Sequence, residues 1–231
     1  KVTYDQSNFK LNKKELYALI KKVKILFIPN PNQPIEDNLT LSELDKICKI
    51  CKKNKTLLVI DEAYHMFGSQ TAAPLIKKYK NILVLRTFSK AFGLPSIRLG
   101  YAIGPEHLIS ILNTYRLSYE TNFLSDEVVQ YFLRNIKNVK KYINSVKNGR
   151  DYFKKELKKL GVKTFGKNSN FVLLKLGEKS KADDLYDFLL DKKIYVKGKY
   201  PDFLSDCLLL TCAKKQTMIK IVNQIKIFLK K

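Results

Sequence analysis

Three short apolar runs, each followed by a cluster of polar residues, constrain the fold of this chain more than any other feature. The runs are Ile25–Ile28, Leu57–Ile60 and Ile82–Arg86. Between the first two lies Thr40-Leu41-Ser42-Glu43, a capping box that predicts a helix continuing to about Lys53. Short apolar runs that alternate with helical stretches favour a mostly parallel sheet with helices packed on its faces.

The remaining segments predict one further strand in this sheet and a second, smaller unit after it. Residues 9–22 predict a helix, and Leu99–Ile103 predicts a fourth strand. From about Leu124 a long amphipathic helical stretch runs to Leu160, and Gly161 predicts its end. Beyond it we expect strands at 170–176, 194–196 and 207–210, a helix at 182–191 capped by Ser180, and a last helix at 216–230. The expected organisation is a large domain over residues 1–123, a connecting helix over 124–148 and a small α+β domain over 149–231.

Polar side chains follow the first three strands at the point where each strand ends. Asn30–Gln33 follow the first strand, Asp61 and Tyr64 follow the second, and Thr87–Lys90 follow the third. Because ligands of such sheets bind at the carboxyl ends of the strands, we expect these groups to lie close together. Arg98 precedes the fourth strand, so it joins the same edge only if that strand runs antiparallel to the third.

The segment Thr87–Gly100 brings Lys90, the hydroxyls of Thr87 and Ser89, and Arg98 within a few residues of each other. A lysine that binds an aldehyde needs a fixed, partly desolvated seat. A phosphate favours hydroxyls and a planar, permanently charged guanidinium. Asp61 adds a carboxylate after the preceding apolar run. This set of groups indicates pyridoxal 5′-phosphate, which requires an amine, a phosphate cradle and a carboxylate for its ring nitrogen.

The composition allows a folded core and narrows the expected partners. Hydrophobic residues make up 45% of the 231 residues, and no apolar run approaches the ~18 residues that span a bilayer. No secretory signal is visible over Lys1–Leu19. The formal charge is +23, but the lysines are spread along the chain and arginine, the usual reader of bases, is scarce. We therefore expect a protein that binds neither a membrane nor nucleic acid.

The cysteines favour a reducing compartment and no metal site. They are Cys48, Cys51, Cys207 and Cys212. Cys48 and Cys51 share one face of the predicted helix with Leu44 and Ile47, which favours burial over metal binding. The chain contains no second closely spaced pair that could complete a metal site. Free thiols without a secretory signal imply a cytoplasmic setting.

Five segments, taken in order, resemble the fold-type I pyridoxal-phosphate-dependent aminotransferases of class I/II, and most closely their histidinol-phosphate aminotransferase branch. The segments are Asn30-Pro31-Asn32-Gln33-Pro34, Asp61-Glu62-Ala63-Tyr64, Ser89-Lys90-Ala91-Phe92-Gly93, Arg98-Leu99-Gly100 and Asn170-Phe171. The resemblance covers nearly the whole chain. It implies an α/β fold: a three-layer α-β-α large domain around a mostly parallel, mixed sheet, followed by a small C-terminal α+β domain.

The resemblance also implies a role for each candidate residue. Lys90 would form the internal aldimine and move protons after substrate exchange, Asp61 would pair with the pyridine nitrogen, and Tyr64 would donate to the ring phenolate. The residues implied to hold the phosphate are Thr87, Ser89 and Arg98. The implied function is transfer of an amino group between a small-molecule amino donor and a keto acceptor, which can be phosphorylated, by a cytoplasmic homodimer.

Two residues depart from the family pattern at positions that matter for ligands. The family has asparagine directly before the proline of the first motif, where this chain has Gln33. Either Gln33 contacts the ring oxygen with its longer arm, or Asn32 serves instead. Leu209 aligns with the arginine that grips the substrate α-carboxylate, and leucine cannot form that ion pair. The nearest candidate cations are Arg116 and the lysines at 197–199.

The largest departure from the family is length. Lys1–Tyr4 aligns with a point well inside the family's large domain, and the ring-stacking aromatic and the first phosphate loop lie upstream of that point. We therefore expect a fragment that lacks the N-terminal part of the cofactor domain. Alternative functions are a decarboxylase of a phosphorylated amino acid with the same cofactor, and an inactive fragment or interaction subunit. An ATPase is a third alternative because Leu57–Glu62 has the form of a Walker B strand, but the chain contains no P-loop.

Overall fold

The computed structural model describes residues 1–230, which form two compact units. The first unit comprises residues 1–33 and 37–139, and the second comprises 34–36 and 140 onward. The division at 139/140 lies inside the stretch 124–148 that we expected to connect two domains. The sequence did not indicate that residues 34–36 belong to the second unit. They do so because Glu36 Oε1 accepts hydrogen bonds from the backbone N–H groups of Lys167 at 2.8 Å and Asn168 at 2.6 Å.

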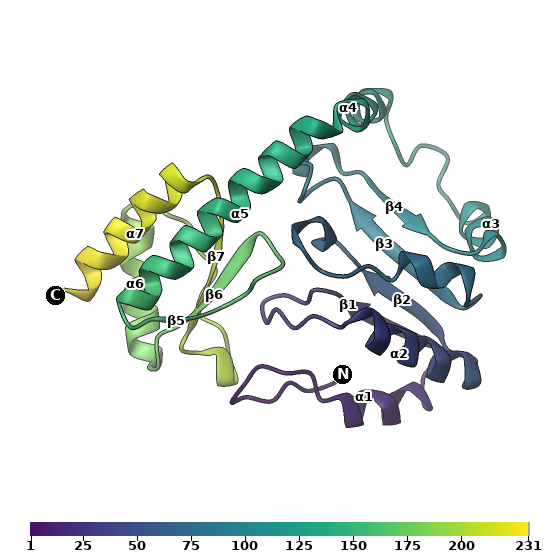
Figure 1. The fold of residues 1–231 in the computed structure, drawn as a ribbon, viewed down its shortest axis with the longest axis horizontal. Helices are drawn as coiled ribbons and strands as arrows, with labels where there is room; N and C mark the ends of the chain where they lie inside the picture. Colours follow the sequence, from purple (N-terminus) through teal and green to yellow (C-terminus); the bar gives the residue numbers. More distant parts are fainter. Residues whose placement is uncertain (231) are drawn as a thin grey trace. The chain divides into compact units, whose positions relative to one another are not determined.

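The first unit is built on a four-stranded mixed sheet in the order β1-β2-β3-β4 (Figure 1). Strands β1, β2 and β3 run parallel, and β4 is antiparallel to β3. The prediction of an α/β fold with a mostly parallel, mixed sheet is confirmed. In chain order the elements are α1 (Lys13–Ile20), β1 (Ile25–Pro29), α2 (Leu41–Lys53), β2 (Leu57–Asp61), β3 (Ile82–Thr87), β4 (Gly100–Ile103), α3 (Glu106–Thr114) and α4 (Phe123–Arg134), with short 3-10 helices at His65–Phe67, Ala73–Lys77 and Pro95–Ile97.

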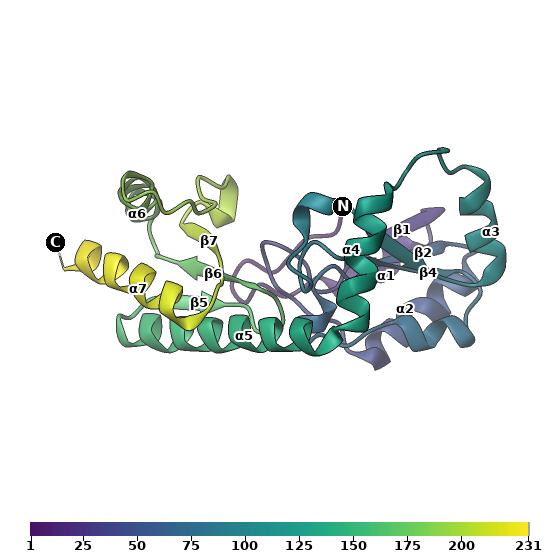
Figure 2. The same cartoon turned by 90° about the horizontal axis from the view of Figure 1, so that it is seen from above.

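The core of this unit lies between one face of the sheet and the helices α1 and α2, which Figure 2 shows on the same side of the strands. The side chains that meet there alternate along the strands with those of the opposite face, as a two-residue period requires. They are Leu26, Ile28, Leu58, Ile60, Ile82 and Val84 from the strands, with Leu16, Ile20, Leu44 and Ile47 from the helices. The expected capping box starts α2, since the Thr40 side chain accepts from the Glu43 N–H and the Glu43 carboxylate accepts from the Thr40 N–H.

The second unit contains an antiparallel sheet in the order β5-β6-β7, with helices packed against it. Strand β6 is apolar and buried along four consecutive residues, so both of its faces are covered. The elements are α5 (Ile136–Lys159), which begins in the first unit, and then β5 (Lys163–Phe165), β6 (Phe171–Lys175), α6 (Lys179–Asp191), a 3-10 helix at Asp202–Leu204, β7 (Cys207–Thr211) and α7 (Lys215–Leu229).

Three expected elements of the C-terminal half were wrong in detail. The stretch 124–160 is two helices, because the Asn135 side chain donates to the Tyr131 carbonyl at 2.9 Å and ends α4. Helix α6 is preceded by Glu178 and has no side-chain cap, so Ser180 lies inside it. Residues 194–196 form no strand. The backbone has positive φ at Lys193 and Lys199, and this leaves only a single bridge to β7 between them.

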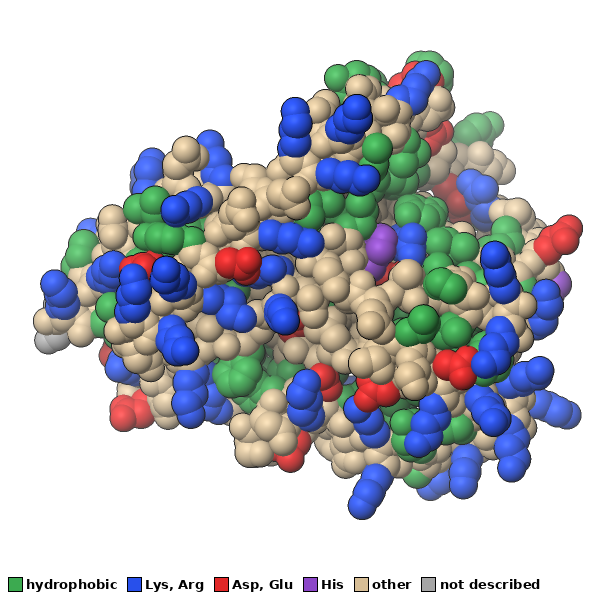
Figure 3. Space-filling model, in the orientation of Figure 1, with side chains coloured by type: hydrophobic (Ala, Val, Ile, Leu, Met, Phe, Trp, Pro, Cys, Tyr) green, Lys and Arg blue, Asp and Glu red, His purple; other side chains and the backbone are tan. Residues whose placement is uncertain are grey.

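The described residues show neither a membrane span nor a cluster suited to a metal ion. None of the helices in residues 1–230 is long and apolar enough to cross a bilayer. In the same residues, no group of three His, Cys, Asp or Glu side chains could hold a metal. All four cysteines are buried and unpaired, and burial raises the pKa of the Cys48 and Cys51 thiols to about 12. Lys and Arg side chains are spread over the visible face in Figure 3.

Candidate active site

The strand register brings the three polar loops to one edge of the sheet. Pro29 of β1 pairs with Asp61 of β2, which in turn pairs with Leu85 of β3, so the three strands end side by side. Because β4 is antiparallel, its first residue Gly100 lies opposite Thr87. Arg98, two residues earlier, therefore joins the same edge. Arg98 was expected at this edge only if β4 runs antiparallel to β3, and it does.

The loop after β1 is held by Asn30, whose side chain is completely buried. Its amide oxygen accepts from the Leu39 N–H at 2.8 Å, and its amide nitrogen donates to the carbonyls of Leu39 at 3.4 Å and Gln70 at 3.3 Å. A buried side-chain amide that bridges two loops fixes their relative position. Asn30 is thus a structural residue that sets the path of the chain toward Gln33.

Gln33, Tyr64 and Lys90 come together from three different loops. The Tyr64 hydroxyl donates to Gln33 Oε1 at 3.1 Å, and Lys90 Nζ lies over the Tyr64 ring, 5.6 Å from its centroid. Burial, and next the charge of Asp61, raise the pKa of Tyr64 to about 12, so this side chain is a phenol and a hydrogen-bond donor at neutral pH. A neutral donor thus stands beside the lysine amine.

The hydroxyls of Thr87 and Ser89 lie next to each other at the end of β3. Thr87 Oγ1 donates to Ser89 Oγ at 2.9 Å, and the Ser89 N–H donates to Thr87 Oγ1 at 3.0 Å. Arg98 is in the left-handed backbone region, with φ 54°, and its guanidinium Nη1 donates to the Pro95 carbonyl at 2.8 Å. Its neighbour Leu99 offers its carbonyl to the Phe88 N–H at 3.1 Å, which ties the Arg98 turn to the loop that follows β3.

Asp61 ends β2 with an exposed carboxylate. Its Oδ1 accepts from the Ala63 N–H at 2.9 Å, and its backbone carbonyl accepts from the Asn30 N–H at 2.7 Å. Both contacts are local and leave the second carboxylate oxygen able to accept from a ligand. The charge of Asp61 also contributes to the raised pKa of Tyr64.

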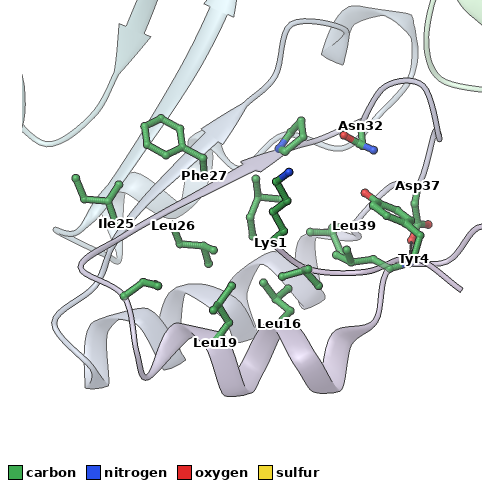
Figure 4. Close-up of a pocket in the computed structure, with 15 residues that line it drawn as sticks. Lys1, Tyr4, Leu16, Leu19, Ile25, Leu26, Phe27, Asn32, Asp37 and Leu39 are labelled. Atoms are coloured by element: carbon green, nitrogen blue, oxygen red, sulfur yellow. Dashed lines mark hydrogen bonds between the residues drawn. The ribbon is translucent and has the colours of Figure 1, made fainter. Parts of the chain in front are cut away.

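Asn32 lines a cavity of ≈ 490 Å³ beside β1 and α1, which is otherwise mostly apolar. Figure 4 shows Leu26 directed toward Leu16 and Leu19 of α1, with Phe27 on the other side of the strand. Of the two residues that the sequence left open as ring contacts, Gln33 reaches Tyr64, whereas Asn32 borders this separate cavity.

A buried ion pair next to these loops was not foreseen. Glu62 is completely buried, and its Oε2 accepts from Arg86 Nε at 3.1 Å and Arg86 Nη2 at 3.0 Å. Glu62 stands in a segment already quoted, directly after Asp61, and Arg86 ends the third apolar run, directly before Thr87. The only signal that could have found the pair was the strand register, which sets an acid and a base opposite each other one residue beyond Asp61 and Leu85.

In the second unit, a backbone bridge places one of the candidate cations, Lys197, directly opposite Leu209. Lys197 bridges Leu209, and the two residues exchange both backbone hydrogen bonds, at 3.0 and 2.7 Å. Directly opposed residues of an antiparallel pair carry their side chains on the same face. Among residues 1–230, Lys197 Nζ has no acidic partner and lies 5.6 Å from the centroid of the Tyr200 ring.

The other two candidate cations are engaged elsewhere. Lys199 Nζ is 2.9 Å from Asp187, and this contact raises its pKa. Arg116 Nε is 2.7 Å from Glu120, four residues further along the chain. Of the cations that the sequence proposed near Leu209, Lys197 is therefore the one with a free ammonium group.

The donor set of the first unit fits pyridoxal 5′-phosphate. It combines an amine held against an aromatic ring, two hydroxyls and a guanidinium beside one loop, and an exposed carboxylate on the next strand. These are the groups that this cofactor's aldehyde, phosphate and ring nitrogen require.

Comparison with known proteins shows the family of the chain. A family model described as aminotransferase class I and II matches residues 1–225. Histidinol-phosphate aminotransferase from Ruminiclostridium cellulolyticum is 35% identical over 199 residues, which are 85% of this chain and 54% of that protein. The chain thus spans about half the length of the curated relatives that it matches.

Solved structures share the fold at lower identity. The histidinol-phosphate aminotransferase of Sinorhizobium meliloti, in complex with pyridoxal-5′-phosphate, superposes with a TM-score of 0.88 at 21% identity over 98% of this chain and 63% of that one. L-threonine-O-3-phosphate decarboxylase from Porphyromonas gingivalis superposes with a TM-score of 0.74 at 20% identity, over 90% of this chain and 65% of the other. At this identity the likeness establishes the fold.

Proposed function

Because this chain belongs to the class I and II aminotransferases, we propose that it transfers an amino group between a small-molecule amino donor and a keto acceptor. Pyridoxal 5′-phosphate is the cofactor that the family indicates. The observation that carries the proposal is the meeting of Gln33, Tyr64 and Lys90 at the sheet edge that also bears Asp61.

Each group at this edge has a task that its chemistry suits. When bound, pyridoxal 5′-phosphate supplies an electrophilic aldehyde and a ring that stabilises negative charge. Lys90 Nζ is the nucleophile toward that aldehyde and afterwards carries protons to and from the substrate. The Asp61 carboxylate holds positive charge at the ring nitrogen. The Tyr64 hydroxyl, which donates to Gln33 Oε1 at 3.1 Å in this structure, would turn its one proton to the ring oxygen.

The phosphate is assigned to the loop after β3. The hydroxyls of Thr87 and Ser89 already lie 2.9 Å apart, so a shared phosphate oxygen can accept from both. Arg98 adds a permanent positive charge on the adjoining turn. These contacts would hold the phosphate, and Lys90, one residue beyond Ser89, would supply the amine for the aldehyde.

For the substrate, we assign the anionic group to Lys197. A leucine at 209 offers no cation, and the opposed Lys197 is the ammonium group that shares its face. An ammonium receives a carboxylate or a phosphate as a point charge and does not require the planar fork of an arginine. This favours donors that carry a phosphate, whose charge is larger.

The test is an assay of the polypeptide as it is naturally made, incubated with pyridoxal 5′-phosphate. The proposal predicts a new visible absorbance band of protein-bound cofactor, and formation of a keto product from at least one donor among histidinol phosphate, glutamate and phosphorylated amines. Release of carbon dioxide without amino transfer would favour a decarboxylase. A polypeptide that binds no cofactor would indicate an interaction subunit.

We also propose that the functional form is a homodimer in a reducing compartment. Large apolar side chains are exposed over and between α3 and α4, which is the kind of surface that subunit contacts bury; they include Ile111, Tyr115, Leu117, Tyr119, Phe123 and Leu124. The four unpaired cysteines favour the cytoplasm. Sedimentation of the natural polypeptide at micromolar concentration should give the mass of a dimer, and a monomer alone would contradict the proposal.

A further inference from the structure

The ion pair Glu62–Arg86 is the most heavily hydrogen-bonded buried group near the candidate site. Arg86 Nε and Nη2 both donate to Glu62 Oε2, and Thr71 Oγ1 donates to the same oxygen at 2.8 Å. Glu62 Oε1 accepts from the Ala72 N–H at 2.5 Å. Arg86 Nη2 also donates to Thr71 Oγ1 at 2.7 Å. Three separate segments of the chain therefore meet at one carboxylate.

This cluster lies on the face of the sheet opposite to the cofactor groups. Asp61 and Leu85 pair in register, and the Glu62 N–H continues the ladder by donating to the Leu85 carbonyl at 2.8 Å. Successive strand residues point to opposite faces. The side chains of Glu62 and Arg86 are consequently on one face, whereas those of Asp61 and Thr87 are on the other.

A buried ion pair of this kind contributes little to stability compared with an apolar pair of the same size. Removing two charges from water carries a large cost, and good geometry does little more than offset it. The Glu62 side chain is fully excluded from solvent and that of Arg86 is 15% exposed. Such a pair instead fixes the orientation of its two side chains, because the forked guanidinium holds the carboxylate in one geometry.

We propose that Glu62 and Arg86 are positioning residues, forming a clamp that sets the spacing between Asp61 and the hydroxyls of Thr87 and Ser89. The inference rests on the proposed function, in which these groups receive the ring nitrogen and the phosphate of one rigid cofactor. A ligand that must satisfy both ends at once depends on that spacing. A ligand that uses one end does not.

The experiment compares three probes that differ in how many ends they use: pyridoxal 5′-phosphate, pyridoxal and inorganic phosphate. Their dissociation constants are measured by equilibrium dialysis on the natural polypeptide and on Glu62→Gln, Arg86→Lys and the double variant Glu62→Leu/Arg86→Met. Thermal unfolding without ligand is recorded for each. The control is the exposed pair Asp45–Lys78, whose nitrogen and oxygen are 2.7 Å apart in the same unit, as Asp45→Asn and Lys78→Met.

If Glu62 and Arg86 act as this clamp, their variants should lose affinity for pyridoxal 5′-phosphate and not for the two smaller probes. The dissociation constant of pyridoxal 5′-phosphate should rise about tenfold or more in all three clamp variants, because sub-ångström misplacement of paired contacts is costly. The constants for pyridoxal and inorganic phosphate should change by less than about threefold, since a single contact loses little when the spacing shifts. The double variant should unfold near the temperature of the parent and still bind the cofactor weakly. The control variants should bind all three probes like the parent.

Two results would overturn the clamp. One is an equal weakening of all three probes that follows the loss of thermal stability, and the other is parent-like cofactor binding in the double variant. Either would make the pair a structural element only. If the parent polypeptide itself binds no pyridoxal 5′-phosphate, the proposed function fails and the clamp fails with it, a result distinct from selective retention in the variants.

Discussion

The sheet edge of the first unit and the centre of β7 in the second unit differ in how they place their candidate ligand-binding groups. At the sheet edge, charged and hydroxyl groups sit in loops directly after strands, within short contiguous segments such as Thr87–Lys90. At β7 the strand itself is apolar at Leu209, and the cation comes from Lys197 on a neighbouring segment. Functional groups in one loop are adjacent in the sequence and can be recognised there. Groups on paired strands come together only through the strand register.

The largest effect is expected on removing the charge of Asp61 at the sheet edge. Asp61→Asn should keep the fold and the bound cofactor but slow turnover by about 10²-fold or more, because a preorganised charge at the ring would be lost. Turnover at saturating cofactor and the absorbance of the bound form are the measurements. Asp184→Asn, an exposed acid on α6, is the matched control. Near-normal turnover of the Asp61 variant would rule out an electronic role.

The cross-strand half of the comparison is tested at Lys197. Lys197→Gln should raise KM for anionic donors by roughly 10- to 100-fold with a smaller change in kcat, since losing one charged contact costs about 1.5–3 kcal/mol. Lys199→Gln removes a neighbouring lysine that is bound to Asp187 and should leave KM close to that of the parent. Equal effects of the two substitutions would mean that general positive charge, and not position opposite Leu209, decides binding.

A smaller effect is expected where a single neutral hydrogen bond is removed from the loop edge. Tyr64→Phe deletes the hydroxyl that donates to Gln33, so the affinity for pyridoxal 5′-phosphate should fall by up to about tenfold. Tyr79→Phe deletes another buried hydroxyl, which donates to Asp45 Oδ1 at 3.1 Å. We expect this second variant to lower thermal stability without changing cofactor affinity. Loss of affinity in both would point to a general packing defect.

The smallest expected effect is on how the stability of the fold depends on pH through His65, the residue after Tyr64. Burial, and next the charge of Arg86, lower the pKa of His65 below its usual 6.5. The unfolded chain then binds more protons, so stability should fall as pH drops below about 6.5. His65→Asn should flatten this loss, by less than about 1 kcal/mol after solvent screening. His107→Asn, exposed on α3, should leave the urea-unfolding curve unchanged between pH 7 and 5.5; a similar flattening there would contradict the assignment to His65.

The features that could be predicted from the sequence are those formed by residues close together in the chain, and the features that could not are contacts across strands. The strands and their polar ends were predictable because apolar runs and turn residues are local signals, as in the capping box at Thr40. The direction of β4 was stated only as a condition for Arg98, the cation nearest Leu209 was left open between Arg116 and the lysines at 197–199, and the partner of Glu62 was missed, because all three depend on pairing between distant segments. The bridge at Lys197 replaced an expected strand for the same reason.

The central claim is that Lys90 is the amine that binds the cofactor at this sheet edge. The most direct measurement is borohydride reduction of the natural polypeptide with pyridoxal 5′-phosphate, followed by peptide mapping of the stably labelled lysine. We expect label on the peptide that contains Lys90, and no labelled peptide from the Lys90→Ala variant. Label on another lysine, or equal labelling of the Lys90→Ala variant, would contradict it.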